Sequence, residues 1–226
     1  MTAWTRDDLR YEIKFAAPSA DVHALHQWIA QHPAGVRNAY PSRRVNNIYF
    51  DTHDLRCYRE VGSAARDKVR LRWYGDTTQP DASTLEIKRR RNRVGWKQKF
   101  DVGGLGLEGT RWRPLLQDVK SRVPAEALIW LNAHPVPVLI NQYNRDYYES
   151  ADRKVRLTID RGQAVFGQNA ATQPKFRGAV RLPDWFVVEI KFAMADEKLG
   201  NEFIQGIPIR ASRNSKYALG AMALFP

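Results

Sequence analysis

The sequence predicts a mainly β fold of the α+β class, in which an eight-stranded antiparallel sheet closes into a barrel tunnel with a charged lumen and flanking helices. Three observations support this prediction. Charged and apolar residues alternate with the strand period of two over much of the 226-residue chain. Helical periodicity is confined to stretches between these segments. No linker or low-complexity segment interrupts the chain, so residues 1–226 are expected to form one domain.

Eight segments show strand alternation. In RYEIKF the arginine, glutamate and lysine share one face, and the apolar residues share the other. KVRLRWY, LEIKR, GWKQKF and WFVVEIKF repeat the scheme, and the turn-like RRNRVG joins LEIKR to GWKQKF. The predicted strands are residues 10–15, 45–51, 68–74, 85–89, 95–100, 140–148, 154–160 and 185–192.

Helices are predicted in three of the remaining stretches. Residues 18–35 offer Ser19 or Asp21 as a cap and end in a Pro/Gly stop. The apolar spacing of residues 110–134 predicts two helical pieces that break at Pro124, and residues 212–225 predict a capped final helix. Residues 167–178 have the composition of a loop.

Composition limits the partners and the cellular setting. The net charge of +12 indicates an anionic partner, which could be nucleic acid, a membrane surface or a phosphorylated molecule. Cys57 is the single cysteine, so a disulfide framework and a Cys-rich metal site are excluded, and we expect Cys57 to serve in packing. The first residues lack the apolar region of a signal peptide, and no apolar stretch is long enough to span a bilayer. A cytoplasmic location is therefore expected.

The charged strand faces are unusually basic. An ordinary antiparallel sheet also turns a polar face to water, so alternation alone does not distinguish a solvated face from a lumen. Solvated faces usually mix the two signs, however, and these faces hold ten bases against four acids. Such crowding is expected around a multiply charged anion, and eight strands can enclose a narrow ligand lumen. The bases are Arg10, Lys14, Arg70, Arg72, Lys88, Lys97, Lys99, Arg145, Arg156 and Lys191, and the acids are Glu12, Glu86, Asp160 and Glu189.

The triplet Glu-Ile-Lys occurs three times, at residues 12–14, 86–88 and 189–191. The strand period sends both charged side chains to one face and the isoleucine to the other. We interpret the lysine as a phosphate ligand and the glutamate as a ligand of a hard divalent cation or a group that orients a neighbouring base.

Taken together, RYEIKF, NNIYFDT, YREVGSAARDKVRLRWYG, LEIKRRRNRVGWKQKF, YNRDYYES, VRLTID, VVEIKF and SRNSKY resemble the VTC domain. This is the polyphosphate polymerase domain of the vacuolar transporter chaperone complex, in the triphosphate tunnel metalloenzyme superfamily. The resemblance implies an eight-stranded antiparallel tunnel that binds a triphosphate and a divalent metal, Mn²⁺ or Mg²⁺. The SPX sensor and the membrane module of the eukaryotic complex have no counterpart in this sequence.

The resemblance also implies roles for individual residues. The late Ser-Lys pair is expected to begin a helix whose free N–H groups favour anions, although an ordinary N-cap explains the serine nearly as well. Arg213, Asn214 and Arg90 depart from the family pattern around these motifs. The implied catalytic residues are Arg70, Arg72, Lys88, Glu189 and Lys191; the implied phosphate ligands are Lys14, Arg59, Lys97, Tyr143, Arg145, Arg156, Ser215 and Lys216; and the implied metal ligand is Glu189.

Three functions are compatible with this pattern. The first is metal-dependent transfer of phosphoryl groups from ATP to a growing inorganic polyphosphate chain. The second is hydrolysis of tripolyphosphate or a nucleoside triphosphate, but Arg10 occupies a position where related hydrolases carry a glutamate. The third is a non-catalytic polyanion binder. Specific nucleic-acid binding is not expected, because Trp73 and Phe192 fall on the apolar face and are not exposed for base stacking. A protein partner is left open.

Overall fold

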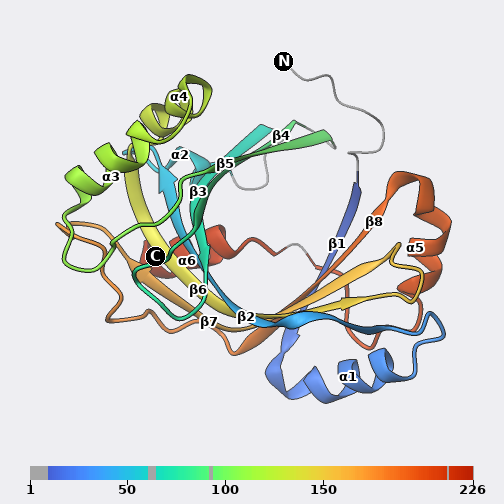
Figure 1. The fold of residues 1–226 in the computed structure, drawn as a ribbon. Helices are drawn as coiled ribbons and strands as arrows, with labels where there is room; N and C mark the ends of the chain where they lie inside the picture. Colours follow the sequence, from blue (N-terminus) through green and yellow to red (C-terminus); the bar gives the residue numbers. More distant parts are fainter. Residues whose placement is uncertain (1–9, 61–64, 92–93, 213, 226) are drawn as a thin grey trace. The chain divides into compact units, whose positions relative to one another are not determined.

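A computed structural model describes residues 10–60, 65–91, 94–212 and 214–225 (Figure 1). Its main element is a sheet of eight strands in the order β1-β8-β7-β6-β2-β3-β4-β5, and every ladder with a described register is antiparallel. The strands are β1 (Arg10–Pro18), β2 (Arg37–Asp51), β3 (Ala65–Tyr74), β4 (Ser83–Arg91), β5 (Val94–Asp101), β6 (Val136–Glu149), β7 (Arg156–Gly167) and β8 (Trp185–Ala193).

All eight predicted strands are confirmed. The main difference is in β2, which begins at Arg37 although the alternation in the sequence indicates a start near Val45. Its first half is largely exposed and contains Pro41, so it lacks the apolar face on which the prediction depended. A turn was predicted at residues 90–95; β4 extends to Arg91 and β5 begins at Val94, and residues 92–93 lie outside the described part of the chain.

Closure of the sheet is not confirmed. The strand order has β1 and β5 at its two ends, and no ladder between them is found within the described ranges. The antiparallel eight-stranded sheet with flanking helices is therefore established, and the closed tunnel stays a prediction.

The chain divides into two compact units, and strands β2, β6 and β7 contribute residues to both. Unit 1 comprises residues 1–43, 143–163 and 183–214, and unit 2 comprises residues 44–142, 164–182 and 215–226. We describe each unit by itself.

Unit 1 is built on the pairing of β1 with β8 and of β8 with β7. The outer faces of these strands carry Phe15, Val188, Ile190 and Phe192, which pack with the helices α1 (Val22–Ala30) and α5 (Glu197–Phe203). Burial of side chains of this size contributes about 1.5–3 kcal/mol each. Helix α5 approaches the sheet closely at Gly200, where an added Cβ would lie 2.4 Å from the Phe192 ring.

Unit 2 is built on β3, β4 and β5. Its larger core packs Leu71, Trp73 and Ile87 against the helices α3 (Trp112–Ser121) and α4 (Ala125–Ala133), which follow one another around Pro124 as predicted. The final helix α6 (Lys216–Leu224) packs with Tyr49, whose side chain shares the face of Arg70. Helix α6 therefore lies against the charged face of the unit 2 strands, whereas α3 and α4 cover the apolar face.

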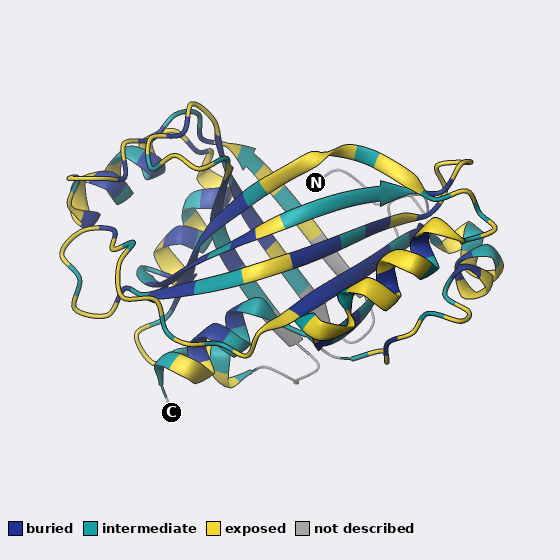
Figure 2. Cartoon of the chain, turned by 90° about the horizontal axis from the view of Figure 1, so that it is seen from below, coloured by how far each residue is buried: buried dark blue, intermediate teal, exposed yellow. Residues whose placement is uncertain are grey.

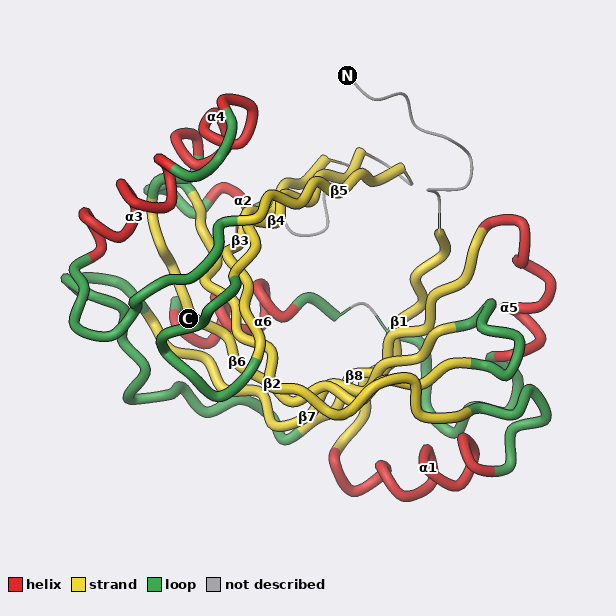
Figure 3. Tube along the Cα trace, viewed as in Figure 1, coloured by secondary structure: helices red, strands yellow, loops and turns green. Residues whose placement is uncertain are grey.

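Figure 2 maps burial onto the strands: the second half of β2 and most of β8 are buried, whereas the first half of β2 is largely exposed. Figure 3 shows the helices and loops that join the strands. The predicted helices at residues 18–35 and 212–225 are confirmed as α1 and α6, although both are shorter than their predicted stretches. The short helices α2 (Arg56–Arg59) and α5 were not predicted. None of the helices in the described ranges has the length and apolar character needed to cross a bilayer.

Candidate functional site

The structure places the predicted site residues in two sets, one on each unit. The prediction that all of them line one lumen is not tested by this division and stays a prediction. Unit 1 carries Lys14, Tyr143, Arg145, Arg156, Glu189 and Lys191, and unit 2 carries Arg59, Arg70, Arg72, Lys88, Lys97, Ser215 and Lys216.

Glu86 is the centre of the unit 2 set. Its carboxylate is buried and accepts hydrogen bonds from Arg70 at 2.5 and 2.7 Å and from Lys97 at 2.6 Å. A nitrogen of Arg72 lies 3.7 Å from the same carboxylate. Burial by itself would raise the pKa of Glu86, but the charges of Arg70, Arg72 and Lys97 outweigh it and hold the pKa well below the usual carboxyl range. Glu86 is therefore an ionised anchor for three bases.

The guanidinium groups of unit 2 have further partners on β2. Arg70 donates to the Tyr49 hydroxyl at 3.0 Å, and Arg72 donates to Asn47 Oδ1 at 2.8 Å. Burial would raise the pKa of Tyr49, but Arg70 and Arg72 lower it overall. These contacts hold both guanidinium groups in fixed orientations. A guanidinium group is well suited to bind phosphate oxygens.

A row of three lysines crosses β3, β4 and β5. In the ladder register Lys68 lies opposite Lys88, and Lys88 lies opposite Lys97. Like charges placed directly opposite one another destabilise a sheet. A row of this kind is expected where a polyanion binds, because its phosphates would offset the repulsion between neighbouring lysines.

The N-terminus of helix α6 adds to the unit 2 set. Ser215 is the N-cap, and its hydroxyl accepts from the Ala218 N–H at 3.3 Å and from Lys68 Nζ at 2.8 Å. Lys216 begins the helix, where the dipole favours anions. Ser215 therefore caps helix α6 and also contacts a base of the unit 2 set.

A buried carboxylate holds this end of α6 in place. Asp51 is fully buried and accepts from the backbone N–H groups of Cys57 at 2.9 Å and Tyr58 at 3.2 Å, and from the hydroxyl of Tyr217. It ties β2 to α2 and α6. The pKa of Cys57 is raised, first by burial and then by Asp51, so the thiol is a packing group as predicted.

Arg59 stands apart from the other predicted residues of unit 2. It lies on α2, its side chain is exposed, and it forms an ion pair with Asp54. The described contacts do not bring it to the Glu86 cluster.

In unit 1 two Glu-Ile-Lys triplets face each other. The antiparallel register of β1 and β8 sets Glu12 opposite Lys191 and Lys14 opposite Glu189. Lys14 Nζ lies 3.0 Å from each glutamate, and Lys191 Nζ lies 2.7 Å from Glu189 and 3.7 Å from Glu12. Burial by itself would lower the pKa of Lys14, but Glu189 and Glu12 raise it overall. The repeated triplet thus builds a square of alternating charge.

Two more bases border this square. Arg145 forms a two-point ion pair with buried Asp160 at 2.5 and 2.7 Å, and a nitrogen of Arg145 lies 4.0 Å from Glu189. Its guanidinium lies 5.4 Å from the centre of the buried Tyr143 ring. Arg156 on β7 lies opposite Lys191, another pair of like charges across neighbouring strands.

The four acids on the charged faces neutralise much of the basic charge. The excess of bases in the sequence suggests a surface without counter-ions, but each acid contacts at least two nitrogen atoms from basic side chains. The physical reason is the register, which brings acids and bases of different strands together. The sites are basic, and their charges are also held in place before a ligand binds.

The residues around Glu189 fit a divalent cation in one particular way. Glu12 and Glu189 present two carboxylates that share Lys14, and Thr158, opposite Glu189, has a buried hydroxyl oxygen without a hydrogen-bond partner. Mg²⁺ commonly uses one or two carboxylates together with substrate phosphates. Within the described ranges no group of three or more His, Cys, Asp or Glu residues is arranged to hold a metal ion. The donor set therefore suits an ion that shares its coordination with phosphate, and does not suit an all-protein cage.

Sequence reasoning missed part of the site. It left Lys68 out of the predicted ligands although this lysine shares the strand parity of Arg70, a signal that could have found it. It also missed Asn47 and Tyr49, whose uncharged side chains carry no sign of their role until the pairing of β2 with β3 is known.

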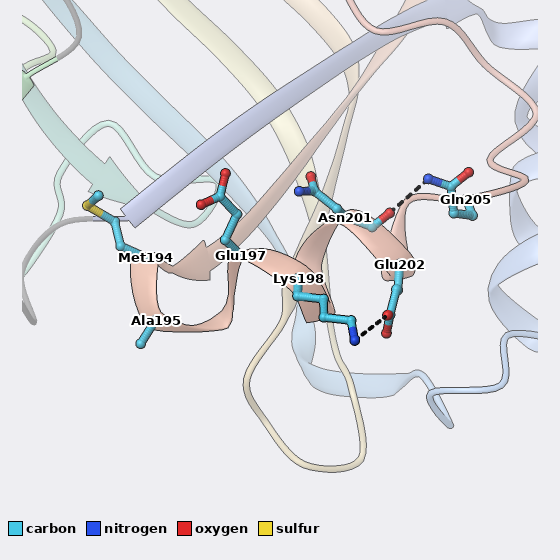
Figure 4. Close-up of a pocket in the computed structure, with 7 residues that line it drawn as sticks. All are labelled: Met194, Ala195, Glu197, Lys198, Asn201, Glu202 and Gln205. Carbon is cyan, nitrogen blue, oxygen red and sulfur yellow. Dashed lines mark hydrogen bonds and ion pairs between the residues drawn. The ribbon is translucent and has the colours of Figure 1, made fainter.

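Unit 1 also has a surface pocket of about 640 Å³. Figure 4 shows its lining on and beside α5, including the ion pair of Lys198 with Glu202 and the hydrogen bond between Gln205 and Asn201. None of the predicted site residues lines it, and its charged side chains are exposed, so we assign it no phosphate-binding role.

The sequence matches the VTC domain family over residues 9–225, and the chain therefore belongs to this family. Membership supports a phosphoryl-transfer function related to polyphosphate or triphosphate. Among curated proteins none matches the chain.

Three solved structures resemble the fold, and none is similar enough to bear on function. A Vibrio parahaemolyticus protein proposed to be an adenylate cyclase has 8% identity and a TM-score of 0.49, with 93% of this chain and 96% of that chain covered. The PH1819 protein of Pyrococcus horikoshii has 12% identity and a TM-score of 0.43, with 92% of this chain and 97% of that chain covered. A chain of the Schizosaccharomyces pombe Mediator head module has 10% identity and a TM-score of 0.46, with 88% of this chain and 96% of that chain covered.

Proposed function

We propose that this VTC domain transfers the γ-phosphoryl group of ATP to the end of an inorganic polyphosphate chain. The lysine row of Lys68, Lys88 and Lys97 is the observation that carries the proposal, because three like charges in register call for a polyanion. The enclosed tunnel predicted from the sequence belongs to this proposal.

The chain's residues would act mainly by positioning. Arg70 and Arg72, already oriented by Glu86, Tyr49 and Asn47, would hold phosphate oxygens, and Lys88 and Lys191 would neutralise charge. The further phosphate ligands in this proposal are Lys14, Lys97, Tyr143, Arg145, Arg156, Ser215 and Lys216; the exposed position of Arg59 adds no support for its place among them.

The transfer needs no general base. An anionic oxygen of the terminal phosphate attacks the γ-phosphorus, a new P–O bond forms, and the bond to the β-phosphate oxygen breaks to release ADP. Mn²⁺ or Mg²⁺ bound at Glu189 with Glu12 would supply further neutralisation of the phosphate charge. Hydrolysis would instead need an activated water. The carboxylates of Glu12, Glu86 and Glu189 are engaged by bases, and the lowered pKa of Glu86 makes it a weak proton acceptor, which supports transfer over hydrolysis.

The test is incubation of the pure protein with ATP and Mn²⁺, followed by separation of phosphate products by chain length. The proposal predicts ADP together with a ladder of polyphosphates. Release of orthophosphate without a ladder would indicate a hydrolase, and ATP binding without turnover would indicate a binder; either result would overturn the proposal. Arg72→Ala should abolish the ladder, whereas Lys198→Ala, a matched loss of an exposed base, should not.

A further inference from the structure

An aromatic and cationic cluster in unit 1 is not used by the proposed phosphate chemistry. Tyr40 on β2 and Tyr147 on β6 pack edge to face, with ring centroids 5.9 Å apart and an interplanar angle of 88°. The guanidinium carbon of Arg43 lies 5.8 Å from the Tyr40 ring centroid and 6.0 Å from that of Tyr147. We call these three residues the Tyr40 cluster.

The Tyr40 cluster is open to a ligand. Tyr40 is 61% exposed, and it borders a pocket of about 330 Å³ lined by residues 38–42 with Asp146 and Tyr147. An exposed tyrosine ring beside a guanidinium plane offers flat surfaces with a positive charge next to them. This combination suits a planar, polarisable ring, because stacking and cation–π contacts both act on its face.

Strand β6 connects the cluster to the phosphate-binding residues of unit 1. Tyr147 follows Arg145 by two positions, so both side chains leave the same face of the strand about 7 Å apart. The intervening Asp146 pairs with Arg161 and also borders the pocket, and Tyr148 packs into the apolar core. A ligand with phosphates at Arg145 can therefore place a ring system beside Tyr147.

We propose that the Tyr40 cluster is a stacking site for the purine base of the nucleoside triphosphate. This inference rests on the proposed function, because it assumes that phosphates bind at Arg145. Polyphosphate has no ring to stack, so the cluster would separate recognition of the nucleotide donor from recognition of the acceptor chain. A purine should bind more tightly than a pyrimidine, because its larger ring system covers more of Tyr40.

The experiment measures dissociation constants of ATP, CTP and tripolyphosphate by calorimetry in metal-free buffer, where turnover is prevented. Tyr40→Ala should weaken ATP binding roughly five- to 150-fold, as expected for the loss of one stacked ring. It should weaken CTP binding less and change tripolyphosphate binding by less than about twofold. Tyr40→Phe keeps the ring and should bind ATP like the wild type. Tyr74→Ala, which removes an exposed tyrosine from β3, is the matched control.

The outcomes separate this inference from the proposed function. Unchanged ATP binding by Tyr40→Ala, or an equal loss for tripolyphosphate, would overturn the stacking site and leave the phosphate site intact. A wild-type protein without preference for ATP over CTP would overturn it in the same way. Binding of a single-stranded oligonucleotide more tightly than ATP, lost in Tyr40→Ala, would replace it with a nucleic-acid site. A wild-type protein that binds neither ATP nor tripolyphosphate would overturn both proposals.

Discussion

Glutamine in place of Glu86 keeps the side-chain shape and removes the charge at the centre of the unit 2 cluster. Arg70 and Lys97 then face a neutral amide at the positions where they now lie 2.5–2.7 Å from a carboxylate. Breaking a buried ion pair by removing one partner costs about 3–5 kcal/mol, because it leaves uncompensated charge. For a chain of this size the loss corresponds to a fall in melting temperature of roughly 6–20 °C.

The same change should improve anion binding in the absence of metal. The phosphates of tripolyphosphate no longer compete with Glu86 for Arg70, Arg72 and Lys97, so the dissociation constant should fall. Saturating tripolyphosphate should then raise the melting temperature more in Glu86→Gln than in the wild type, since a ligand at about 100 times its dissociation constant adds about 2.7 kcal/mol.

The assay is thermal unfolding of both proteins with and without tripolyphosphate. Glu202→Gln is the control, because its pair with Lys198 is highly exposed and should contribute little to stability. A fall in melting temperature as small as that of the control, together with unchanged tripolyphosphate affinity, would refute the role of Glu86 as an internal counter-ion.

Further expectations follow from other contacts. Glu189→Gln should strengthen metal-free ATP binding and reduce Mn²⁺-dependent product formation by orders of magnitude; undiminished synthesis would remove this residue from the metal site. Lys14→Ala should lower the melting temperature, because it removes one of the two lysines that contact both Glu12 and Glu189, and calorimetric unfolding checks this. Burial, opposed by Glu86 but aided by Arg70, lowers the pKa of Lys97 to about 8. Between pH 8 and about 10.5 the unfolded chain holds this proton and the folded chain does not, so the contribution of Lys97 to the free energy of unfolding should rise with pH while phosphate affinity falls. Arginine stays charged over this pH range, so in Lys97→Arg the free energy of unfolding should not show this rise with pH, and phosphate affinity should not show this fall. Tyr217→Phe removes the hydroxyl that donates to a buried carboxylate and should cost about 1.5–3 kcal/mol by denaturant unfolding; a loss below 0.5 kcal/mol would contradict the tie between β2 and α6.

The strands were predictable because their alternation has a physical cause that acts locally. In KVRLRWY each apolar residue packs toward α3 and α4, and each base turns to the other face, so the pattern carries the structure. The first half of β2 has no apolar face and was missed. The short helix α5 packs closely on the sheet where Gly200 meets Phe192, a tertiary contact that no local pattern reveals.

The candidate site was predictable in its members but not in its pairing. The strand period of two placed Arg70, Lys88 and Lys191 on the charged faces of their strands. It could not show that Glu86 contacts bases on β3 and β5, because that depends on the register between strands. This difference reverses one expectation. From the sequence alone, Arg72→Ala or Lys191→Ala should leave stability equal or higher by relieving repulsion. In the structure Lys191 contacts Glu189 at 2.7 Å and Arg72 donates to buried Asn47, so both substitutions should lower it.

In the square formed by the paired triplets, both lysines already contact carboxylates before any phosphate binds. Its lysines hold carboxylates that are tethered to the chain and therefore present at high local concentration. A single orthophosphate has to displace these carboxylates without help from a neighbouring phosphate. In a polyphosphate, the binding of one phosphate raises the local concentration of the next, so linked phosphates displace several carboxylates in succession. The site would then select its ligands by length, and dissociation constants of ortho-, pyro- and tripolyphosphate, measured together, should fall more steeply than their charge alone requires.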